Sequence, residues 1–374
     1  MSNKKIFAFA SATLCFISVV AGLSYMKKNG VFERYPDAVY LDDDDAAVRP
    51  IYQQLGKDEK AVYTALYEGI SEGRKEIKFP CVIDGDTYTK LYCILEKQEG
   101  GLFQADYYFY VAKKMRSVDV SYLTDDESEL QAKRSLFDEK VKDIVDSAPS
   151  GEYEKALYIH DAVVNGCEYD ADTKFSGTAY GCLVEGKARC EGYAKAFCHL
   201  ARELDMECVV VTGKTTDGED HAWNQIKIDG EWYNCDVTWD DPKGANLCEY
   251  NYFLCSDAEF LYDESNSDNE NKHIPDDTFE PFECGGGQNY YEREGLCASS
   301  ISEAEEVIRR ELTNGNRNIK IKFDSEQLAD EFELTYINDG HIFDIAYEVI
   351  GGSADMKISF GRDEATHSVT ILIE

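Results

Sequence analysis

Apolar and polar positions recur with two spacings over the first 150 residues. Val62, Leu66 and Ile70 lie four positions apart, which predicts a helix over 58–72. The strings YYFYVAKK and SVDVSYL are typical of strands, and a polar helix is expected over 126–146. These patterns predict a small N-terminal α/β region over 50–150.

A second α/β pattern closes the sequence. The strings NIKIKF, DMKISF and SVTILI alternate like half-buried strands. Ser302 and Glu305 fit a capping box ahead of an apolar helix. A C-terminal accessory α/β domain is therefore predicted over 299–374, and a glycine-rich joint over 283–298 is expected to connect it to a central block over 151–282.

The N-terminus joins an uncharged run to flanking lysines. Ile6 to Met26 has no acidic or basic side chain, and Lys4-Lys5 and Lys27-Lys28 border it. As a helix this run rises about 31 Å, enough to cross a bilayer core of roughly 30 Å. Residues 1–28 are thus expected to be a signal anchor, or a signal peptide if cleavage occurs at the small residues near Gly22. Either form puts the rest of the chain outside the cytosol, as a single-pass cell-membrane protein or a secreted one.

Composition and charge argue against a nucleic-acid-binding function. The 38 basic and 73 acidic residues give a net charge of −35, which repels nucleic acid. A hydrophobic share of 43% supplies enough apolar material to fold. The acidic run Asp42–Asp45 is read as a solvated spacer in a linker over 29–49. No motif indicates a cofactor or a metal.

The chain has 13 cysteines, and export would favour disulfides. Most of them lie in apolar-periodic segments, where a free cysteine behaves as a small hydrophobe. The pairs Cys248–Cys255 and Cys284–Cys297 stay open as bridges, and no pair has CxxC spacing.

Cys190 has a different setting, because it opens a segment with a strong helical period. The expected apolar face contains Tyr193, Ala196, Phe197, Leu200, Ala201 and Leu204, and the opposite face contains Lys195, Arg202 and Glu203. In a first helical turn, free N–H groups and the helix dipole stabilise a thiolate. Gly192 is expected to leave room for a substrate backbone.

A nucleophilic thiol needs a base, and His221 is the best candidate among six histidines. His199 follows Cys190 on the same helix at about 13 Å along the axis, too far to reach it. His160 is expected to be structural, and His273 falls in a late polar region.

His221 is the first residue of the strand-like string HAWNQIKI. Asp229-Gly230 and a second strand-like string, EWYNCDV, come next, and this order is the signature of a β-hairpin. A two-residue turn places Ile228 opposite Glu231, which makes Asp236 the diagonal neighbour of His221, at roughly 7 to 8 Å between backbones. An imidazole and a carboxylate can span that distance. Asp236 is therefore predicted to accept the Nδ1–H of His221 and to orient the ring.

Three blocks in order resemble the transglutaminase-like superfamily, in its bacterial exported branch: YGCLVEGKARCEGYAKAFCHLARELDMECVVVTG, HAWNQIKIDGEWYNCDVTWDDP and YNYFLCSD. The resemblance covers about residues 155 to 275. It implies an α+β fold with a papain-like transglutaminase core, in which the cysteine helix packs on an antiparallel sheet that carries the histidine and the aspartate. It also implies a catalytic triad of Cys190, His221 and Asp236.

Other residues are candidates for the substrate cleft. Arg189 stands where the family commonly has an aliphatic residue, and it either favours an acidic substrate or forms an ion pair. The backbone N–H of Cys190 and the side chain of Tyr180 are candidate oxyanion donors. Trp223 and Trp239 either wall the cleft or pack in the core.

The predicted function is an exported cysteine-dependent acyl-transfer enzyme that hydrolyses peptide or carboxamide bonds through a thioester. Its expected substrates are proteins or peptides, cell-wall peptides among them. Two alternatives stay open. One is a protein-glutamine γ-glutamyltransferase that crosslinks proteins, and the other is a non-catalytic surface or wall-binding module on the same fold.

Overall fold

The computed structural model describes residues 35–106, 112–241, 248–265, 271–285, 288–351 and 356–374. The chain forms two compact units. One contains Gly56–Leu91 and Tyr108–Val120, and the other contains Leu41–Leu55, Tyr92–Tyr107 and Ser121–Glu374. The N-terminal unit is thus discontinuous, and it differs from the single region over 50–150 expected from the sequence.

The N-terminal unit is a helix packed on a strand pair. Helix α4 (Lys57–Ser71) confirms the helix predicted over 58–72, and its apolar positions are buried. Strand β1 (Glu76–Ile83) pairs antiparallel with β3 (Met115–Asp119), which confirms part of the SVDVSYL strand. Most of YYFYVAKK lies outside the described residues. A helix that the sequence reading missed, α5 (Gly85–Gln98), follows β1.

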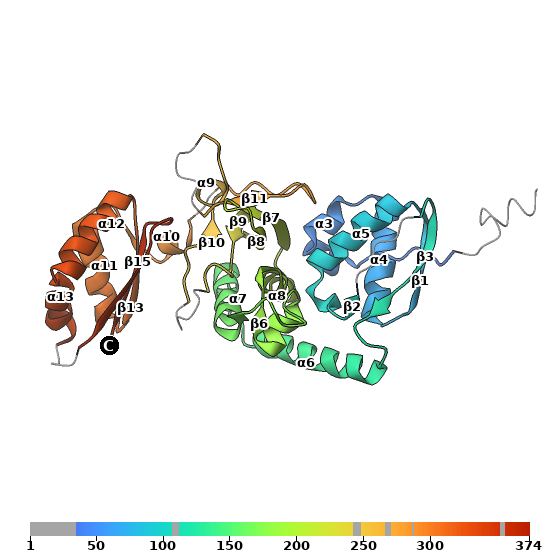
Figure 1. Ribbon diagram of the computed structural model, residues 1–374, viewed down its shortest axis with the longest axis horizontal. Coiled ribbons are helices and arrows are strands. Elements are labelled where there is room, and N and C mark those ends of the chain that lie inside the picture. The colour runs from blue at the N-terminus through green and yellow to red at the C-terminus, as the bar shows by residue number, and fades with distance from the viewer. Residues whose placement is uncertain (1–34, 107–111, 242–247, 266–270, 286–287, 352–355) are drawn as a thin grey trace, which may run out of the picture. The chain divides into compact units, whose positions relative to one another are not determined.

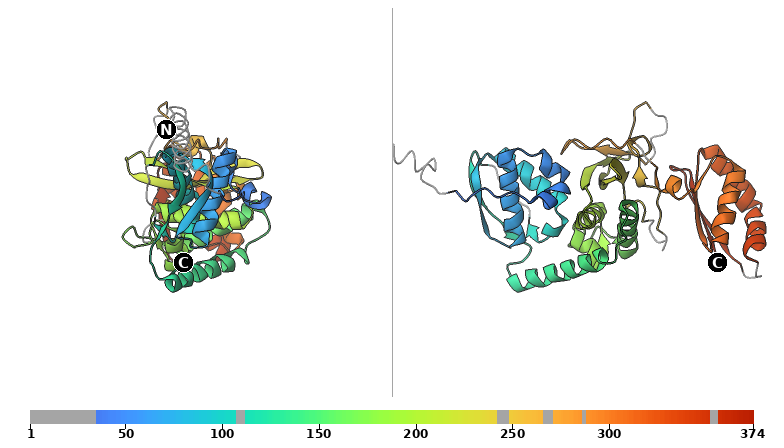
Figure 2. Two further views of the ribbon diagram at one scale, coloured as in Figure 1. Left: turned by 90° about the vertical axis from the view of Figure 1, so that its right-hand side faces the viewer. Right: turned by 180° about the vertical axis from the view of Figure 1, so that it is seen from behind.

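The larger unit is built on a five-stranded antiparallel sheet with the order β10-β9-β8-β7-β11. Its strands are β7 (Cys208–Thr215), β8 (Asp220–Ile228), β9 (Glu231–Cys235), β10 (Phe253–Cys255) and β11 (His273–Pro275). Helices α7 (Glu152–Gly166) and α8 (Cys190–Glu203) lie side by side on one face of this sheet (Figures 1 and 2). The predicted α+β core, with the cysteine helix packed on an antiparallel sheet, is confirmed.

The hairpin of β8 and β9 has the predicted register. Ile228 lies opposite Glu231, and Asn224 lies opposite Cys235. Asp229 and Gly230 have φ of 53° and 88°, the left-handed conformations that a tight two-residue turn requires. Asp236 therefore follows directly on the last paired residue of β9.

The apolar face of α8 is buried as predicted, but Lys195 and Arg202 on the opposite face are also buried. Lys195 forms ion pairs with Glu96 and Glu191. Arg202 pairs with Glu99 at 2.9 Å and donates to the carbonyl of Cys208. A buried cation persists only when it is paired. Two of these acids lie about a hundred residues earlier in the chain, so helical periodicity gave no sign of them.

The C-terminal part of this unit is a four-stranded sheet with helices on one face (Figure 1). The sheet order is β12-β13-β15-β14, with strands β12 (Cys297–Ala298), β13 (Asn318–Phe323), β14 (Ile358–Asp363) and β15 (Ser368–Ile373). The helices are α11 (Ile301–Thr313), α12 (Glu326–Phe332), the π-helical turn η3 (Glu333–Asn338) and α13 (His341–Ile350). Strands β13 and β15 confirm NIKIKF and SVTILI, β14 covers the second half of DMKISF, and α11 confirms the apolar helix.

The cap of α11 is two residues earlier than predicted. Ser300 caps the helix, and its hydroxyl accepts the N–H of Glu303 at 3.3 Å. Ser302 instead lies within the first turn. Ser299, Ser300 and Ser302 all offered caps within four residues, and burial of Ala304, Val307 and Ile308 favours the start at Ile301.

The remaining elements complete the larger unit. They are α2 (Asp43–Ala47), α3 (Pro50–Gln54), η1 (Gly100–Leu102), β2 (Ala105–Asp106), β4 (Ser121–Tyr122), α6 (Glu127–Val145), β5 (Glu168–Tyr169), η2 (Gly181–Glu185), β6 (Lys187–Ala188), α9 (Asp257–Phe260) and α10 (Tyr290–Arg293). Helix α6 confirms the polar helix predicted over 126–146. The acidic run Asp42–Asp45 is not a spacer, because it caps and begins α2, where carboxylates complement the helix dipole. The expected joint over 283–298 contains α10 and β12.

Among the described residues, none of the helices combines the length and the apolar character that a membrane crossing needs. The predicted anchor or signal segment, Ile6–Met26, lies outside them.

Candidate active site

Cys190 is the first residue of α8, as predicted, and its side chain is partly exposed. The residue before it, Arg189, is extended and caps the helix, and its carbonyl accepts the N–H groups of Gly192 and Tyr193. The N–H groups of Cys190 and Glu191 precede these first helical hydrogen bonds and have no acceptor within the helix. This is the setting in which a cysteine thiolate is stabilised.

His221, near the start of β8, lies between the thiol and Asp236. Its Nε2 is 2.6 Å from the Asp236 Oδ2, and the side chain of Cys190 is near enough to help raise the pKa of the ring. The structure thus brings the three predicted residues together. The predicted use of Nδ1 is wrong, because Nε2 makes the bond to Asp236. Asp236 is a diagonal neighbour along the sheet, so the far nitrogen of the ring reaches it.

Asp236 is fully buried and accepts four hydrogen bonds. The N–H groups of Thr238 and Trp239 donate to Oδ1 at 3.0 and 3.3 Å. His221 and His273 donate to Oδ2 at 2.6 and 3.0 Å. Burial alone would raise the pKa of Asp236, but the charge of His221 and these donors hold it well below its usual value. The side chain is therefore a fixed carboxylate.

We expect His221 to titrate near pH 10. Burial alone would lower its pKa, but the charge and the hydrogen bond of Asp236 outweigh burial and raise the pKa of His221 from 6.5 to about 10. The stabilisation from this raised pKa is complete below about pH 6.5 and is lost as the pH rises through about 10. The lowered pKa of Asp236 adds stability that is lost as the pH falls below the usual carboxyl value of 3.8.

An NMR titration of the His221 ring measures its pKa, with Asp236→Asn as the comparison. A His221 ring that titrates near pH 6.5 in the unaltered protein would contradict the ion pair with Asp236.

His273 is a site residue that the sequence reading missed. It lies on the edge strand β11, is fully buried, and donates from Nε2 to the Asp236 Oδ2. Its ring stacks on Phe260 with centroids 3.8 Å apart and contacts Trp239 at 4.3 Å. Burial lowers the pKa of His273, so it is a neutral donor. It therefore helps to hold Asp236 in place.

His273→Phe should slow the chemistry and leave the packing largely intact. The phenyl ring keeps the stacking, whereas the hydrogen bond to a charged group, worth about 1.5–3 kcal/mol, is lost. We expect the rate of Cys190 alkylation at neutral pH to fall about 10- to 100-fold. The pKa of His221 should also change, because the Asp236 carboxylate accepts hydrogen bonds from both His221 and His273. Phe260→Leu is the matched control that removes the stacking partner and keeps the donor. Equal effects of the two variants would show that His273 only packs.

The remaining predicted cleft residues divide between the site and the core. Trp239 is partly exposed and stacks on His221 with centroids 5.2 Å apart, so it walls the site. Trp223 is 1% exposed and is a core residue. Tyr180 is also buried and stacks on Phe103 at 4.7 Å, so it is not in place as an oxyanion donor. Arg189 forms the ion pair that the sequence left open, at 2.6 Å from Glu191.

Gly192 has a different role from the one expected. A Cβ there would lie 2.4 Å from the carbonyl oxygen of Ser176 and 2.8 Å from the Cβ of Ala188. Glycine is therefore required because the start of α8 packs on its own chain. It does not serve to admit a substrate backbone.

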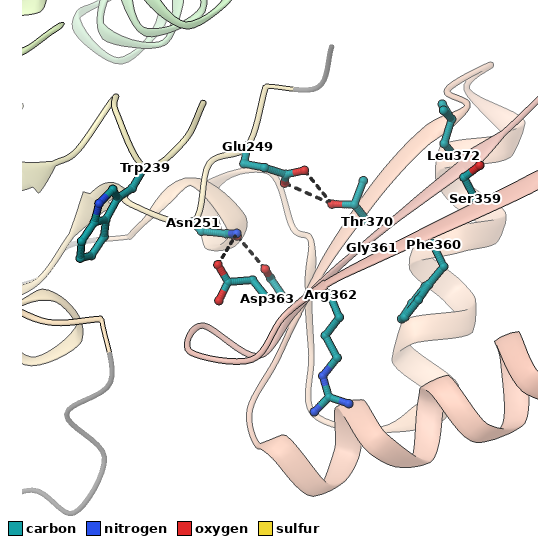
Figure 3. A pocket seen from close by; sticks show the side chains of 11 residues that line it. Trp239, Glu249, Asn251, Ser359, Phe360, Gly361, Arg362, Asp363, Thr370 and Leu372 are labelled. Atoms are coloured by element: carbon teal, nitrogen blue, oxygen red, sulfur yellow. Dashed lines mark hydrogen bonds between the residues drawn. The ribbon is translucent and has the colours of Figure 1, made fainter. Parts of the chain in front are cut away.

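A hollow of about 330 Å³ begins at Trp239 and extends over the C-terminal sheet (Figure 3). Polar side chains line much of it, and Asn251 donates to Asp363 while Glu249 accepts from Thr370. Because Trp239 also stacks on His221, a ligand in this hollow would contact the ring that packs on the imidazole.

All cysteines among the described residues are free. The bridges left open from the sequence, Cys248–Cys255 and Cys284–Cys297, are therefore not formed. Cys255 and Cys284 are buried, and burial raises the pKa of both thiols.

The helix-on-sheet fold and the ordered group of thiol, imidazole and carboxylate define a transglutaminase-like domain. The model of the Transglutaminase-like superfamily matches residues 139–237, a range that contains Cys190, His221 and Asp236. This match confirms the resemblance stated from the sequence blocks.

Two similar proteins, from mouse and human, match this chain over about half of its length. Kyphoscoliosis peptidase of Mus musculus is 28% identical over 221 residues, which is 50% of this chain and 32% of that protein. The Homo sapiens protein of the same name is 28% identical over 225 residues, covering 52% and 32%. The chain thus spans about a third of the length of these relatives. A solved TGase structure is 17% identical, with a TM-score of 0.29, over 46% of this chain and 56% of that one.

Proposed function

We propose that the protein is a cysteine-dependent acyl-transfer enzyme that hydrolyses peptide or carboxamide bonds. The observation that carries the proposal is the hydrogen bond of His221 to Asp236 together with the raised pKa of that imidazole, to which the partly exposed Cys190 contributes. A protonated imidazole next to a thiol is the arrangement that cysteine nucleophiles require.

In the first half-reaction the Sγ of Cys190 attacks the carbonyl carbon of the substrate, and the carbonyl oxygen becomes an oxyanion. The backbone N–H of Cys190, in the first turn of α8, is the donor placed to stabilise it. The C–N bond then breaks, His221 gives its proton to the leaving amine, and a thioester remains on Cys190.

In the second half-reaction water attacks the thioester while His221 takes its proton. The C–S bond breaks, the carboxylic acid leaves, and the thiolate and imidazolium are restored. Asp236 holds the ring in one orientation through both steps, and His273 holds Asp236. If a primary amine attacks in place of water, the same site forms an amide and crosslinks proteins.

Hydrolysis is favoured over crosslinking because the matched relatives are named peptidases. The test is to incubate the purified protein with an unfolded trial protein, with and without a labelled primary amine. Cleavage or deamidation that Cys190→Ala abolishes would support hydrolysis, whereas label incorporated into the trial protein would select transamidation. If neither occurs, the non-catalytic binding module is favoured.

We also propose that the chain is exported, on the strength of the uncharged run Ile6–Met26 between lysine pairs. A reporter that is active only outside the cytosol, fused after Glu374, should be active. Activity only of a cytosolic reporter would reject export, and a mature N-terminus near Leu23 would select the cleaved form over the anchor.

A further inference from the structure

A second group of histidine, aspartate and cysteine lies outside the proposed active site. His160 and Asp161 are adjacent near the middle of α7, and Cys248 precedes β10. The Nδ1 of His160 is 3.1 Å from the Asp161 Oδ1 and 3.8 Å from the Cys248 Sγ, and that sulfur is 3.5 Å from the same Oδ1. Three atoms of types that bind metals therefore converge on one point.

These separations match the edges of a tetrahedral metal site. With bonds of about 2.0 to 2.3 Å to oxygen, nitrogen and sulfur, tetrahedral angles place the ligand atoms roughly 3.3 to 3.6 Å apart. The three observed distances bracket that range. A metal ion therefore fits between the three atoms with small side-chain adjustments.

The other side of His160 is occupied by a carboxylate that fixes the ring. Its Nε2 is 3.1 Å from the Asp240 Oδ2, and both side chains are fully buried. The second oxygen of Asp240 accepts the backbone N–H of Tyr252 at 3.0 Å, which holds the carboxylate in place. A carboxylate behind a histidine is the usual outer partner of a metal-binding imidazole.

This arrangement also leaves a contact that calls for a cation. If Nε2 donates its proton to Asp240, a neutral His160 presents a lone pair at Nδ1, and the carboxylate of Asp161 faces it with another lone pair at 3.1 Å. A second proton on Nδ1 satisfies this contact, and a metal ion held between the same two atoms would satisfy it as well. The Cys248 thiol donates to the same Asp161 oxygen at 3.5 Å, so its sulfur is placed as a third ligand for a metal ion that displaces its proton.

We propose that His160 Nδ1, Asp161 Oδ1 and Cys248 Sγ bind a divalent transition-metal ion of the zinc class. Asp161 and Cys248 are partly exposed, so the ion can enter from solvent and keep a water as its fourth ligand. The site departs from the sequence-based expectation of no metal, since its residues lie 87 positions apart and form no motif.

Metal binding at this site would join helix α7 to the segment that leads into β10. Asp240 links the site to the triad, because its backbone N–H donates to the carbonyl oxygen of Asp236 at 3.2 Å. A bound ion is therefore expected to stabilise the loop that carries Asp236, and the site is structural, with no part in the acyl-transfer steps.

The test is a titration of the untagged, full-length protein with Co²⁺ and Zn²⁺. Co²⁺ should produce a thiolate-to-metal charge-transfer band, and equilibrium dialysis should give one tightly bound Zn²⁺ per chain. Cys248→Ser should abolish the band and weaken Zn²⁺ binding at least tenfold, and Asp240→Asn should weaken it about 10- to 100-fold. Zn²⁺ should also raise the melting temperature of the unaltered protein but not of Cys248→Ser.

Cys190→Ala is the matched control, since it removes the thiol of the proposed active site and keeps this cluster. It should leave the band and the Zn²⁺ affinity unchanged, so failure of the metal proposal and failure of the proposed function are separate results. The proposal is overturned if no band forms, if the band persists in Cys248→Ser, or if it disappears in Cys190→Ala. Circular dichroism of each variant confirms that it is folded.

Discussion

Asp236→Asn is expected to lower turnover by about a thousandfold or more while the protein stays folded. The amide keeps the size of the carboxylate, but it cannot hold an imidazolium and accept from both rings. His221 would lose the partner that raises its pKa and fixes its orientation. The measurement is kcat on whichever substrate the trial assay identifies, together with the rate of Cys190 alkylation.

The control for Asp236→Asn must remove one negative charge near His221 without removing a hydrogen bond to it. Asp240 and Asp241 lie beyond the strand, and from the sequence alone their Asn variants are expected to retain most activity. Neither is a matched control, because Asp240 is buried against His160 and Asp241 accepts from the hydroxyl of Tyr193 at 2.5 Å, so each change also removes a hydrogen bond. Asp220 is the better control, since it adjoins His221 and its side chain is 90% exposed. If Asp220→Asn were as damaging as Asp236→Asn, charge rather than orientation would be the cause.

Cys190→Ala is expected to have the largest effect, a loss of turnover of about a millionfold, as seen when the nucleophile of a triad is removed. The substitution should change stability little, because the side chain is partly exposed at a helix start. Cys297→Ser, at another partly exposed cysteine, is the control and should retain turnover. Residual activity in Cys190→Ala equal to that of Cys297→Ser would exclude a thioester on Cys190.

Local patterns predicted the parts of the site that depend on nearby residues. The turn residues Asp229 and Gly230 determine the hairpin register, and the register places Asp236 beside His221. The helical period that begins at Cys190 likewise predicted α8 and its buried face. The residues that make each pattern lie within about fifteen positions of the hairpin pair or the helix that the pattern predicts.

The contributions that the sequence did not reveal come from distant segments. His273 follows Asp236 by 37 residues and reaches it because the edge strand β11 pairs with β7. No period or motif connects these two positions. The same holds for Cys248 and His160, which meet only because the segment before β10 lies against α7. Such contacts depend on how the sheet is assembled, which a single sequence does not show.

The choice of ring nitrogen was also beyond the sequence. The register showed that His221 and Asp236 are neighbours, but the side-chain torsions that decide between Nδ1 and Nε2 depend on what packs around the ring. Trp239 stacks on His221 and His273 contacts it at 5.4 Å, and these neighbours set the orientation observed.

Mapping of thiol reactivity tests the central claim most directly, because it needs no known substrate. The protein is alkylated briefly at neutral pH with less than one equivalent of reagent, and the label is located by mass spectrometry. Burial raises the pKa of the other partly exposed thiols, Cys81, Cys93, Cys248 and Cys297, whereas Cys190 adjoins a protonated imidazole. We expect the label mainly on Cys190 and a slower uptake of label in Asp236→Asn. Label spread evenly over these cysteines, or unchanged uptake in Asp236→Asn, would contradict an activated nucleophile at this position.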